Sequence, residues 1–226
     1  MDHFDRQTRP WEPTISVRAS LYRSYLKRII DVILVLGALP FVGPLLLVIA
    51  LAIRFTSRGP ILYRQERIGK DGQPFYMLKF RTMRPDGGTS THREHVENLI
   101  RNNLTPGDLG TTSLKLTTDP RITPVGKVLR DLSLDELPQL FNVLRGEMSI
   151  VGPRPPLPYE YALYKPWHKQ RLAVLPGITG LWQVTAHNTV SFNEMVKIDL
   201  DYIERMSMRL DWWIMLMTPM EVLNGA

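Results

Sequence analysis

The sequence predicts an α/β protein in which a compact domain follows a proline-broken, re-entrant membrane helix. Three observations predict this architecture: one long uncharged run near the N-terminus, two alternating segments typical of strands, and several segments with the apolar spacing of helices. At 226 residues the chain is long enough for one domain with a sizeable core and a membrane element. We divide it into a loosely attached segment at residues 1–20, the membrane helix at 21–56 and the compact domain at 57–226.

Charge and cysteine content narrow the class of protein. The 28 Lys and Arg residues exceed the 22 Asp and Glu residues, which gives a formal net charge of +6. A positive balance favours nucleic acid, anionic lipid or phosphorylated substrates as partners. Because the positive residues flank the apolar run and no helix-turn-helix pattern occurs, we expect no nucleic-acid partner. The absence of cysteine excludes a disulfide framework and a thiolate metal site.

The uncharged run extends from Val32 to Ile53. As a straight helix it would be about 33 Å long, against a hydrocarbon core of about 30 Å. Pro40 and the Gly43-Pro44 pair lie near its middle, where a proline removes a helical hydrogen bond and bends the helix. Basic residues, which mark the cytoplasmic side, stand on both sides of the run: Arg18, Arg23, Lys27 and Arg28 before it, and Arg54, Arg58, Arg64, Arg67 and Lys70 after it. We therefore predict a helix that enters the membrane and returns to the same face, with a kinked spanning helix as the alternative.

The compact domain begins with two predicted strands. Residues 61–65 and 75–81 read as strands, and Lys70-Asp71-Gly72 between them supplies the turn of a hairpin. Strand alternation places Lys79 and Arg81 on one face of the second strand. The segment from 85 to 118 is rich in Gly, Thr, Asn and charge, which predicts an excursion with one short helix near residues 95–102.

Later segments predict helices over residues 125–130, 137–144, 159–175 and 210–223. The last of these contains Trp212 and Trp213 among apolar residues, a composition that suits a membrane interface and equally a buried core. We expect amphipathic helices of this kind at the interface. Residues 177–180, Gly-Ile-Thr-Gly, are interpreted as a tight structural turn.

Two adjacent carboxylates, Asp135 and Glu136, stand at the predicted start of the helix over residues 137–144. A carboxylate at a helix N-terminus lies in a positive field among free N–H groups, which keep it ionised as a nucleophile and can receive phosphate oxygens. The alternative is a capping box, because Ser133 and Glu136 have the Ser-x-x-Glu spacing in which both side chains satisfy backbone amides. Pro138 favours a helix that begins near Asp135, since a missing N–H is tolerated in the first turn.

A series of short motifs in a fixed order is more specific than any one of them. The series comprises Lys27-Arg28-Ile29-Ile30-Asp31, Ser57-Arg58-Gly59-Pro60, Gln65-Glu66-Arg67-Ile68-Gly69, Lys79-Phe80-Arg81-Thr82-Met83, Asp119-Pro120-Arg121-Ile122-Thr123, Ser133 to Asn142, Arg145-Gly146-Glu147-Met148-Ser149, Val151-Gly152-Pro153-Arg154-Pro155 and Pro176-Gly177-Ile178-Thr179-Gly180. With these motifs the chain resembles the bacterial sugar transferases, the monotopic polyprenyl-phosphate phosphoglycosyl transferases. The resemblance covers about residues 25 to 223, and it is to the small members that consist of little beyond the catalytic domain.

The resemblance implies an activity, a cofactor and a location. Members move a sugar 1-phosphate from a nucleotide diphosphate sugar to undecaprenyl phosphate in two steps, with Asp135 matching the nucleophile and Glu136 the residue associated with Mg²⁺. Their membrane helix breaks at a proline, matched here by Pro44, and re-enters on the cytoplasmic side of the bacterial inner membrane. The compact domain is then a cytosolic catalytic domain, and its expected partners are a UDP-sugar, undecaprenyl phosphate and membrane lipid.

Further residues match the family's substrate site. Lys79, Arg130 and Arg154 match basic positions that would neutralise phosphate oxygens and the leaving nucleotide. Asp211 matches an acidic position of the same site, although N-capping of the last helix would explain it as well.

Two questions stay open at this stage. We expect the transferred sugar to be a hexose, galactose or glucose. Residues 185–188, Thr-Ala-His-Asn, depart from the Gly-Arg that precedes an asparagine in many members, so the identity of the sugar stays open. The second open question is the oligomeric state, for which a homodimer is one option.

The alternative function from another class is a non-enzymatic basic membrane-surface protein that recruits glycan-assembly partners.

Overall fold

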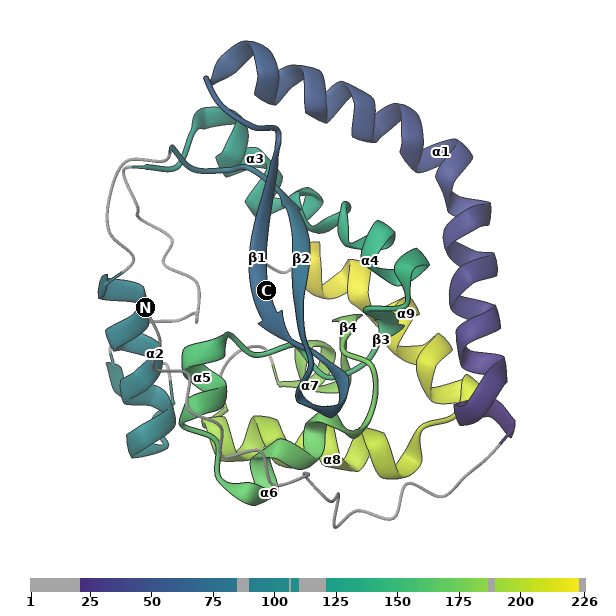
Figure 1. Cartoon of the computed structure of the whole chain (residues 1–226), viewed down its shortest axis with the longest axis vertical. Helices are drawn as coiled ribbons and strands as arrows, with labels where there is room; N and C mark the ends of the chain where they lie inside the picture. Colours follow the sequence, from purple (N-terminus) through teal and green to yellow (C-terminus); the bar gives the residue numbers. More distant parts are fainter. Residues whose placement is uncertain (1–20, 85–89, 106, 110–120, 187–189, 224–226) are drawn as a thin grey trace.

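The computed structural model describes residues 21–84, 90–105, 107–109, 121–186 and 190–223. Our expectation for residues 1–20 therefore lies outside the described residues. The uncharged run forms one long helix, α1, Lys27–Thr56, which a short π-helical turn over Tyr22–Leu26 precedes. Pro40 and Pro44 lie inside α1 without ending it, and Figure 1 shows α1 bending as it passes around the outside of the molecule. The predicted break is therefore a bend in a continuous helix.

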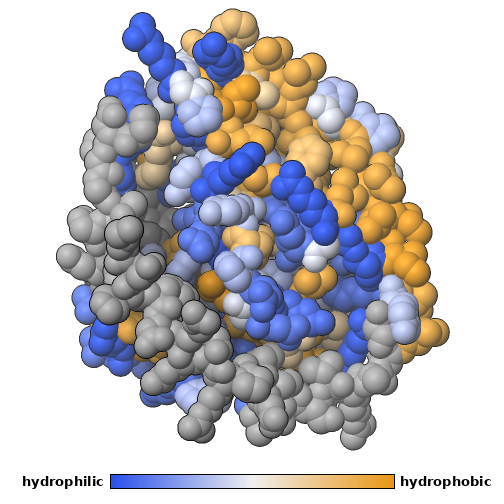
Figure 2. Space-filling view, in the orientation of Figure 1, coloured by the Kyte–Doolittle hydropathy of each residue, from blue (hydrophilic) through white to orange (hydrophobic). Residues whose placement is uncertain are grey.

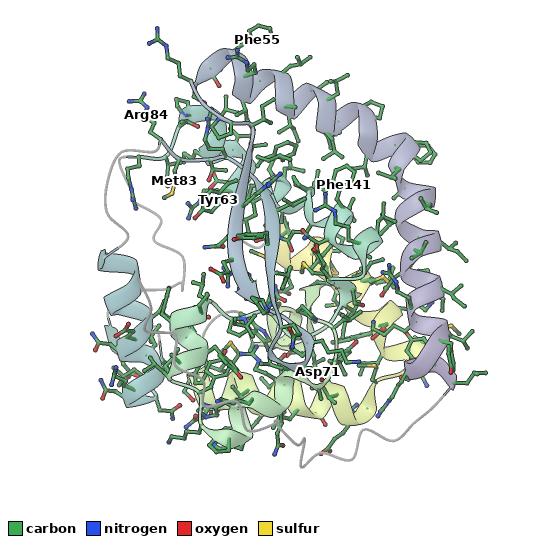
Figure 3. All side chains as sticks on the ribbon, viewed as in Figure 1. Phe55, Tyr63, Asp71, Met83, Arg84 and Phe141 are labelled. Carbon is green, nitrogen blue, oxygen red and sulfur yellow. The ribbon has the colours of Figure 1, made fainter. Side chains whose placement is uncertain are left out.

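The predicted hairpin is confirmed. Strand β1, Leu62–Ile68, pairs antiparallel with β2, Pro74–Phe80. The connection is a short 3₁₀ turn in which Asp71 has φ of 55°, and Figure 3 shows Asp71 at the tip of the hairpin. The short polar side chain of Asp is one of the few that tolerate this left-handed conformation. In the pairing register Lys79 lies opposite Tyr63.

Short helices surround the hairpin, as Figure 1 shows. They are α2, Ser90–Asn102; α3, Pro124–Asp131; α4, Gln139–Arg145; α5, Pro158–Ala162; α6, Pro166–Lys169; α7, Leu181–Thr185; α8, Phe192–Arg205; and α9, Met208–Leu223. The single helix predicted over 159–175 is wrong, because Pro166 starts a new helix there instead of continuing the previous one. Helix α8 was not predicted, although Ser191 and Glu194 form a capping box at its start.

A second, two-stranded sheet lies at the centre of the fold. Strand β3, Ser149–Val151, pairs parallel with β4, Gly177–Thr179, so the tight turn predicted at residues 177–180 is in fact a strand. The two backbones approach closely where Gly152 faces Gly177. A Cβ added to Gly177 would lie 2.1 Å from the Gly152 nitrogen, so only glycine fits this contact.

Helix α1 packs on the rest of the protein mainly through its two ends. Its buried residues are confined to the ends: Lys27, Asp31, Val35, Ile49 and Ile53. The first end contacts α4 and β3 and the second contacts α3. Val35 packs with Met77 and Val143, whereas Ile49 and Ile53 belong to a second cluster. The helix is therefore attached to one body at both of its ends.

Most of α1 exposes apolar side chains. Its exposed large apolar residues are Ile29, Ile33, Leu36, Phe41, Leu45, Leu47, Val48, Leu51 and Phe55. Figure 2 shows the corresponding hydrophobic surface gathered along α1, beside a hydrophilic area over the middle of the same face. Within the described residues α1 is the one helix long and apolar enough to cross a membrane, and its exposure shows that it is not the core helix of a soluble protein.

Candidate active site

Asp135 and Glu136 lie in a 3₁₀ turn, Leu134–Glu136, between α3 and α4. Ser133 precedes the turn with φ of 52°, and its side chain makes no capping hydrogen bond. The capping-box alternative is therefore not supported. The α-helix begins at Gln139 rather than near Asp135, because the chain first completes this tighter turn and then passes through Pro138. Both carboxylates are half-buried.

Lys79 lies directly beside this pair. Its Nζ is 2.6 Å from Oε1 of Glu136, and both side chains are largely shielded, with 15% and 17% of their surface exposed. The contact joins the end of the hairpin to the turn that carries the carboxylates. The sequence predicted that Lys79 lies with Asp135 and Glu136. The structure brings Lys79 into contact with Glu136. Arg81, predicted on the same face of β2, instead donates to the backbone and hydroxyl oxygens of Ser57 at the end of α1.

Asn142 fixes the turn relative to Lys79. This side chain is fully buried on α4, where its Oδ1 accepts from the Leu78 N–H at 2.9 Å and its Nδ2 donates to the Tyr76 carbonyl at 2.8 Å. These bonds pair α4 with the free backbone edge of β2, next to Lys79. Sequence reasoning missed Asn142; the signal was a polar residue inside the apolar stripe of a predicted helix, which requires buried partners.

The loop that carries Arg154 is held from two sides. On one side the Gly177 N–H donates to the Pro153 carbonyl at 3.0 Å, and on the other the Ile68 N–H donates to the Pro156 carbonyl at 2.9 Å. Prolines supply no N–H, so anchoring bonds to this loop must end on its carbonyl groups. Half-buried Arg154 therefore extends from a backbone fixed to both small sheets.

Arg67 joins the same loop from β1. It is 5% exposed, donates from Nη1 to the Pro155 carbonyl at 2.8 Å and from Nη2 to Oε1 of Gln65 at 2.9 Å. Burial, and secondarily the nearby charge of Arg154, lower the pKa of Arg67 to about 10, while Glu136 acts in the opposite direction. From the sequence, Arg67 is a positive charge that flanks the apolar run and a member of the Gln65–Gly69 motif, with no predicted place in the site. Its place beside the site follows from the pairing of β1 with β2. The sequence predicted that these strands pair but not which residues lie opposite one another.

Arg130 and Asp211 complete the predicted set. Arg130 is half-buried on α3, the helix immediately before the carboxylate turn. Asp211 is 3% exposed in the first turn of α9 and accepts from Lys27 at 2.5 Å, from Tyr22 at 2.5 Å and from Tyr202 at 2.8 Å. These partners belong to the base of α1 and to α8. The N-cap alternative for Asp211 is wrong, since Asp211 lies inside the helix.

The base of α1 is tied down by further polar contacts. Asp31 accepts from the Ser149 hydroxyl at 2.7 Å, and Arg28 donates to the carbonyls of Val143 and Leu144 at the end of α4. A guanidinium at this position satisfies carbonyls that a helix leaves without partners. We call Lys27, Asp31, Ser149, Tyr202 and Asp211 the base network.

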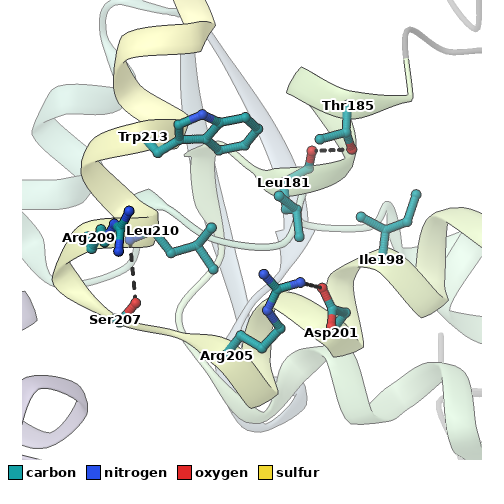
Figure 4. A pocket seen from close by; sticks show the side chains of 9 residues that line it. All are labelled: Leu181, Thr185, Ile198, Asp201, Arg205, Ser207, Arg209, Leu210 and Trp213. Atoms are coloured by element: carbon teal, nitrogen blue, oxygen red, sulfur yellow. Dashed lines mark hydrogen bonds and ion pairs between the residues drawn. The ribbon is translucent and has the colours of Figure 1, made fainter.

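A separate pocket of about 680 Å³ lies between α7, α8 and α9. Figure 4 shows Trp213 and Leu210 of α9 on one side, Ile198 and Asp201 of α8 on the other, and Leu181 of α7 between them. None of the predicted site residues lines it. The pocket therefore does not contain the carboxylate pair.

Comparison with known proteins gives a consistent result. A family model described as bacterial sugar transferase matches residues 22–225. The exopolysaccharide production protein ExoY of Sinorhizobium fredii is 42% identical over 192 residues, which cover 85% of this chain and 83% of that protein. The chain belongs to the bacterial sugar transferase family.

Two longer relatives carry names that state a reaction. The UDP-glucose:undecaprenyl-phosphate glucose-1-phosphate transferase of Xanthomonas campestris is 41% identical over 207 residues, 88% of this chain and 39% of that protein. The undecaprenyl-phosphate galactose phosphotransferase of Salmonella typhimurium is 36% identical over 200 residues, 88% of this chain and 41% of that protein. The resemblance predicted from the ordered motifs is confirmed, and the chain is an enzyme, a phosphoglycosyl transferase. The non-enzymatic alternative is set aside.

Mg²⁺ is the cofactor that the family resemblance implies. Among the residues that the structure describes, no group of three or more His, Cys, Asp or Glu side chains could hold a metal ion by itself. Mg²⁺ at phosphate-transfer sites is usually bound through one or two carboxylates together with substrate phosphates. The half-buried pair Asp135 and Glu136 fits that donor set, and Glu136 is the residue that would hold the ion.

Proposed function

We propose that this sugar transferase moves a sugar 1-phosphate from a UDP-sugar to undecaprenyl phosphate through a covalent intermediate on Asp135, and so starts assembly of a polysaccharide or glycoconjugate. The names of the Xanthomonas and Salmonella relatives support the substrates. The observation that carries the mechanism is the half-buried pair of carboxylates in one 3₁₀ turn, with the Lys79 ammonium fixed 2.6 Å from Glu136 directly beside Asp135.

The proposed reaction has two displacement steps. First, a carboxylate oxygen of Asp135 forms a bond to the sugar-linked phosphorus, the bond from that phosphorus to the bridging oxygen breaks, and UMP leaves with the electron pair. The sugar phosphate then remains on Asp135 as a mixed anhydride. Second, an oxygen of undecaprenyl phosphate attacks the same phosphorus and releases the Asp135 carboxylate. The product is an undecaprenyl diphosphate sugar.

Charge is the main obstacle to the first step, because an anion must approach a diphosphate. Cations fixed in advance around the phosphate oxygens lower this barrier without reorganising during the reaction. Lys79, Arg130 and Arg154 are the residues that would do so, and Lys79 also holds Glu136 in place. When bound, Mg²⁺ would neutralise phosphate oxygens as a Lewis acid, with Glu136 as its protein ligand.

The membrane arrangement follows from α1. We propose that α1 enters the bacterial inner membrane from the cytoplasmic face and returns to it, with the prolines at its deepest part. Burial of α1 only at its two ends supports this, since both ends then lie with the catalytic domain on one side of the bilayer. The exposed apolar side chains in the middle of α1, such as Phe41 and Leu45, belong to no core cluster and would lie in the lipid.

Donor sugar without acceptor tests the mechanism. Wild-type enzyme with Mg²⁺ and a panel of UDP-hexoses, galactose and glucose first, should release UMP in a burst no larger than the enzyme concentration. Asp135→Asn should abolish the burst, by roughly 10⁴-fold or more in rate, without lowering the thermal unfolding temperature. Formation of UMP only when undecaprenyl phosphate is added would contradict the covalent intermediate.

Introduced cysteines test the topology in this cysteine-free chain. Cysteines at Ser20 and Ser57 should both resist an impermeant thiol reagent in intact cells and both react after the membrane is opened. Labelling of one of them alone in intact cells would show a spanning helix. Replacing Pro40 and Pro44 by Ala should straighten α1 and move the labelling towards that spanning pattern.

A further inference from the structure

Arg67 is a buried cation that the proposed chemistry has not used. It lies on β1 with 5% of its surface exposed. Within the part of the chain that the structure describes, no Asp or Glu oxygen lies within ion-pair distance of it; its hydrogen-bond partners are Gln65 and the Pro155 carbonyl, both neutral. A buried charge with neutral partners alone is unfavourable, because proteins normally pair such charges.

Groups of both charge signs act on Arg67. Arg154 is close enough to disfavour the charged form of Arg67, and Glu160, Glu136 and Tyr159 are close enough to favour it. The two guanidinium groups therefore repel one another across the loop that carries Arg154. A further anion placed near both groups would relieve this repulsion, which a bound diphosphate would do.

We propose that Arg67 is a positioning residue for diphosphate binding: it holds the Arg154 loop through the Pro155 carbonyl and adds a second fixed positive charge behind Arg154. This inference rests on the proposed function, because it names the diphosphate of the donor as the anion. The bond from Arg67 to Pro155 and the bond from Ile68 to Pro156 come from consecutive residues of β1. Strand β1 therefore fixes the loop directly after Arg154, and the Arg154 side chain is directed from a backbone that cannot shift independently of the hairpin.

Geometry explains why an arginine is suited to this position. The planar guanidinium reaches two acceptors at once, Gln65 on its own strand and Pro155 across the gap, and each of its three nitrogens has an acceptor. Lysine would keep the charge, but its single ammonium group could not donate to Gln65 and to the Pro155 carbonyl with the same geometry. Buried lysine also loses its proton at a lower pH than buried arginine.

Binding of UDP and the donor-only burst test the role of Arg67 in the full-length enzyme reconstituted in lipid nanodiscs. Arg67→Gln should weaken UDP binding, measured by calorimetry, by about 10- to 100-fold, because the Arg154 loop loses its charge-assisted bond at Pro155 and the site loses a nearby positive charge. Arg67→Lys should bind UDP with an intermediate affinity. As the pH is raised, its burst rate should begin to decline at a lower pH than that of wild type, because the buried lysine loses its proton first. Guanidinium ion added to Arg67→Ala should restore part of the burst. If Arg67 were merely structural, the pH dependence of the burst in Arg67→Lys would match that of wild type, and guanidinium ion would not restore the burst in Arg67→Ala.

Arg64→Gln is the matched control, since Arg64 lies on the same strand and is exposed. It should leave UDP affinity within about twofold, because exposed charges contribute little. If Arg67→Gln fails to fold, Gln65→Leu removes two of the acceptor contacts while keeping the charge, and it should shift UDP affinity in the same direction. Unchanged UDP affinity in folded Arg67→Gln or Gln65→Leu would overturn the inference. Absence of UDP binding and of a UMP burst in wild type would instead overturn the proposed function.

Discussion

Two lysine–carboxylate pairs of nearly equal length have different surroundings in this enzyme. Lys27 lies 2.5 Å from Asp211 in the base network, and Lys79 lies 2.6 Å from Glu136 in the candidate active site. Asp211 also receives two tyrosine hydroxyls and is almost inaccessible. Glu136 is more accessible, and its charge also acts on Arg67 of the neighbouring strand β1. The two pairs are therefore alike in the distance between their charges and differ in the exposure of the carboxylate, which is 5% for Asp211 and 17% for Glu136.

The largest expected effect is on catalysis at the second pair. Lys79→Met and Glu136→Gln should each lower steady-state transfer by about 10²- to 10³-fold, as removal of a fixed charge at a reacting centre does. The unfolding temperature should fall less than it does for Asp211 variants, because both side chains keep more access to water than the base-network pair. Glu66→Gln, an exposed carboxylate on β1, is the control. A variant that loses stability in proportion to activity would show that the pair is structural, like the base network.

The base network should show the reverse. Asp211→Ala leaves Lys27 buried without its carboxylate and should lower the free energy of unfolding by about 3–5 kcal/mol, measured by denaturant titration in one detergent. Turnover per folded molecule should stay near the wild-type value. The sequence prediction that Asp211 binds substrate gives a different outcome, a raised KM with unchanged stability, so the two measurements decide between the roles.

A buried histidine gives a reference that involves no ion pair. Nδ1 of His168 accepts from the Lys165 N–H at 3.1 Å and Nε2 lies 3.0 Å from the Asn193 amide oxygen, so the ring is held neutral with its proton on Nε2. Burial lowers the pKa of His168. The unfolded chain then binds a proton that the folded chain resists, so stability is full above about pH 6.5 and falls as the pH drops below it. His168→Gln should flatten this part of the stability profile in thermal unfolding measured from pH 7.5 to 5.

The smallest effect is expected at an exposed pair that resembles the other two only in its charges. Arg205 and Asp201 are 2.9 Å apart on α8, with 65% and 45% of their side chains exposed, at the rim of the pocket in Figure 4. A double-mutant cycle with alanine should give a coupling energy of about 0.3–0.5 kcal/mol at most, which decreases with added salt. A coupling of several kcal/mol would show that exposure does not set the contribution of these pairs.

Local patterns predicted the parts of the fold that depend on neighbours in the sequence. The hairpin, the long apolar helix α1 and helices α3, α4 and α9 follow from alternation, apolar spacing and prolines. The parallel pairing of β3 with β4 could not be predicted this way, because strands of three residues carry no periodicity and their partners are far apart in the chain.

The candidate site shows the same division. The carboxylate pair and Lys79 were found from their motifs, whereas Arg67 and Asn142 become site residues only through tertiary contacts. Asp211 was matched to a site position from its motif, and tertiary contacts place its carboxylate with Lys27 and two tyrosines, so its binding of substrate stays a prediction. Sequence motifs identify which residues matter, and the packing decides whether they serve the site or the scaffold.

Attachment of α1 at both ends has a practical consequence for purification. A shortened chain that starts after Thr56, the obvious choice for removing an insoluble anchor, would also remove Val35, Ile49 and Ile53 from two core clusters and Lys27 from Asp211. Such a chain would expose apolar core surface and leave a buried carboxylate without its cation, and it should aggregate rather than become water-soluble. Solubility is better sought by replacing the exposed apolar side chains in the middle of α1, which contact no core cluster, while both ends are kept.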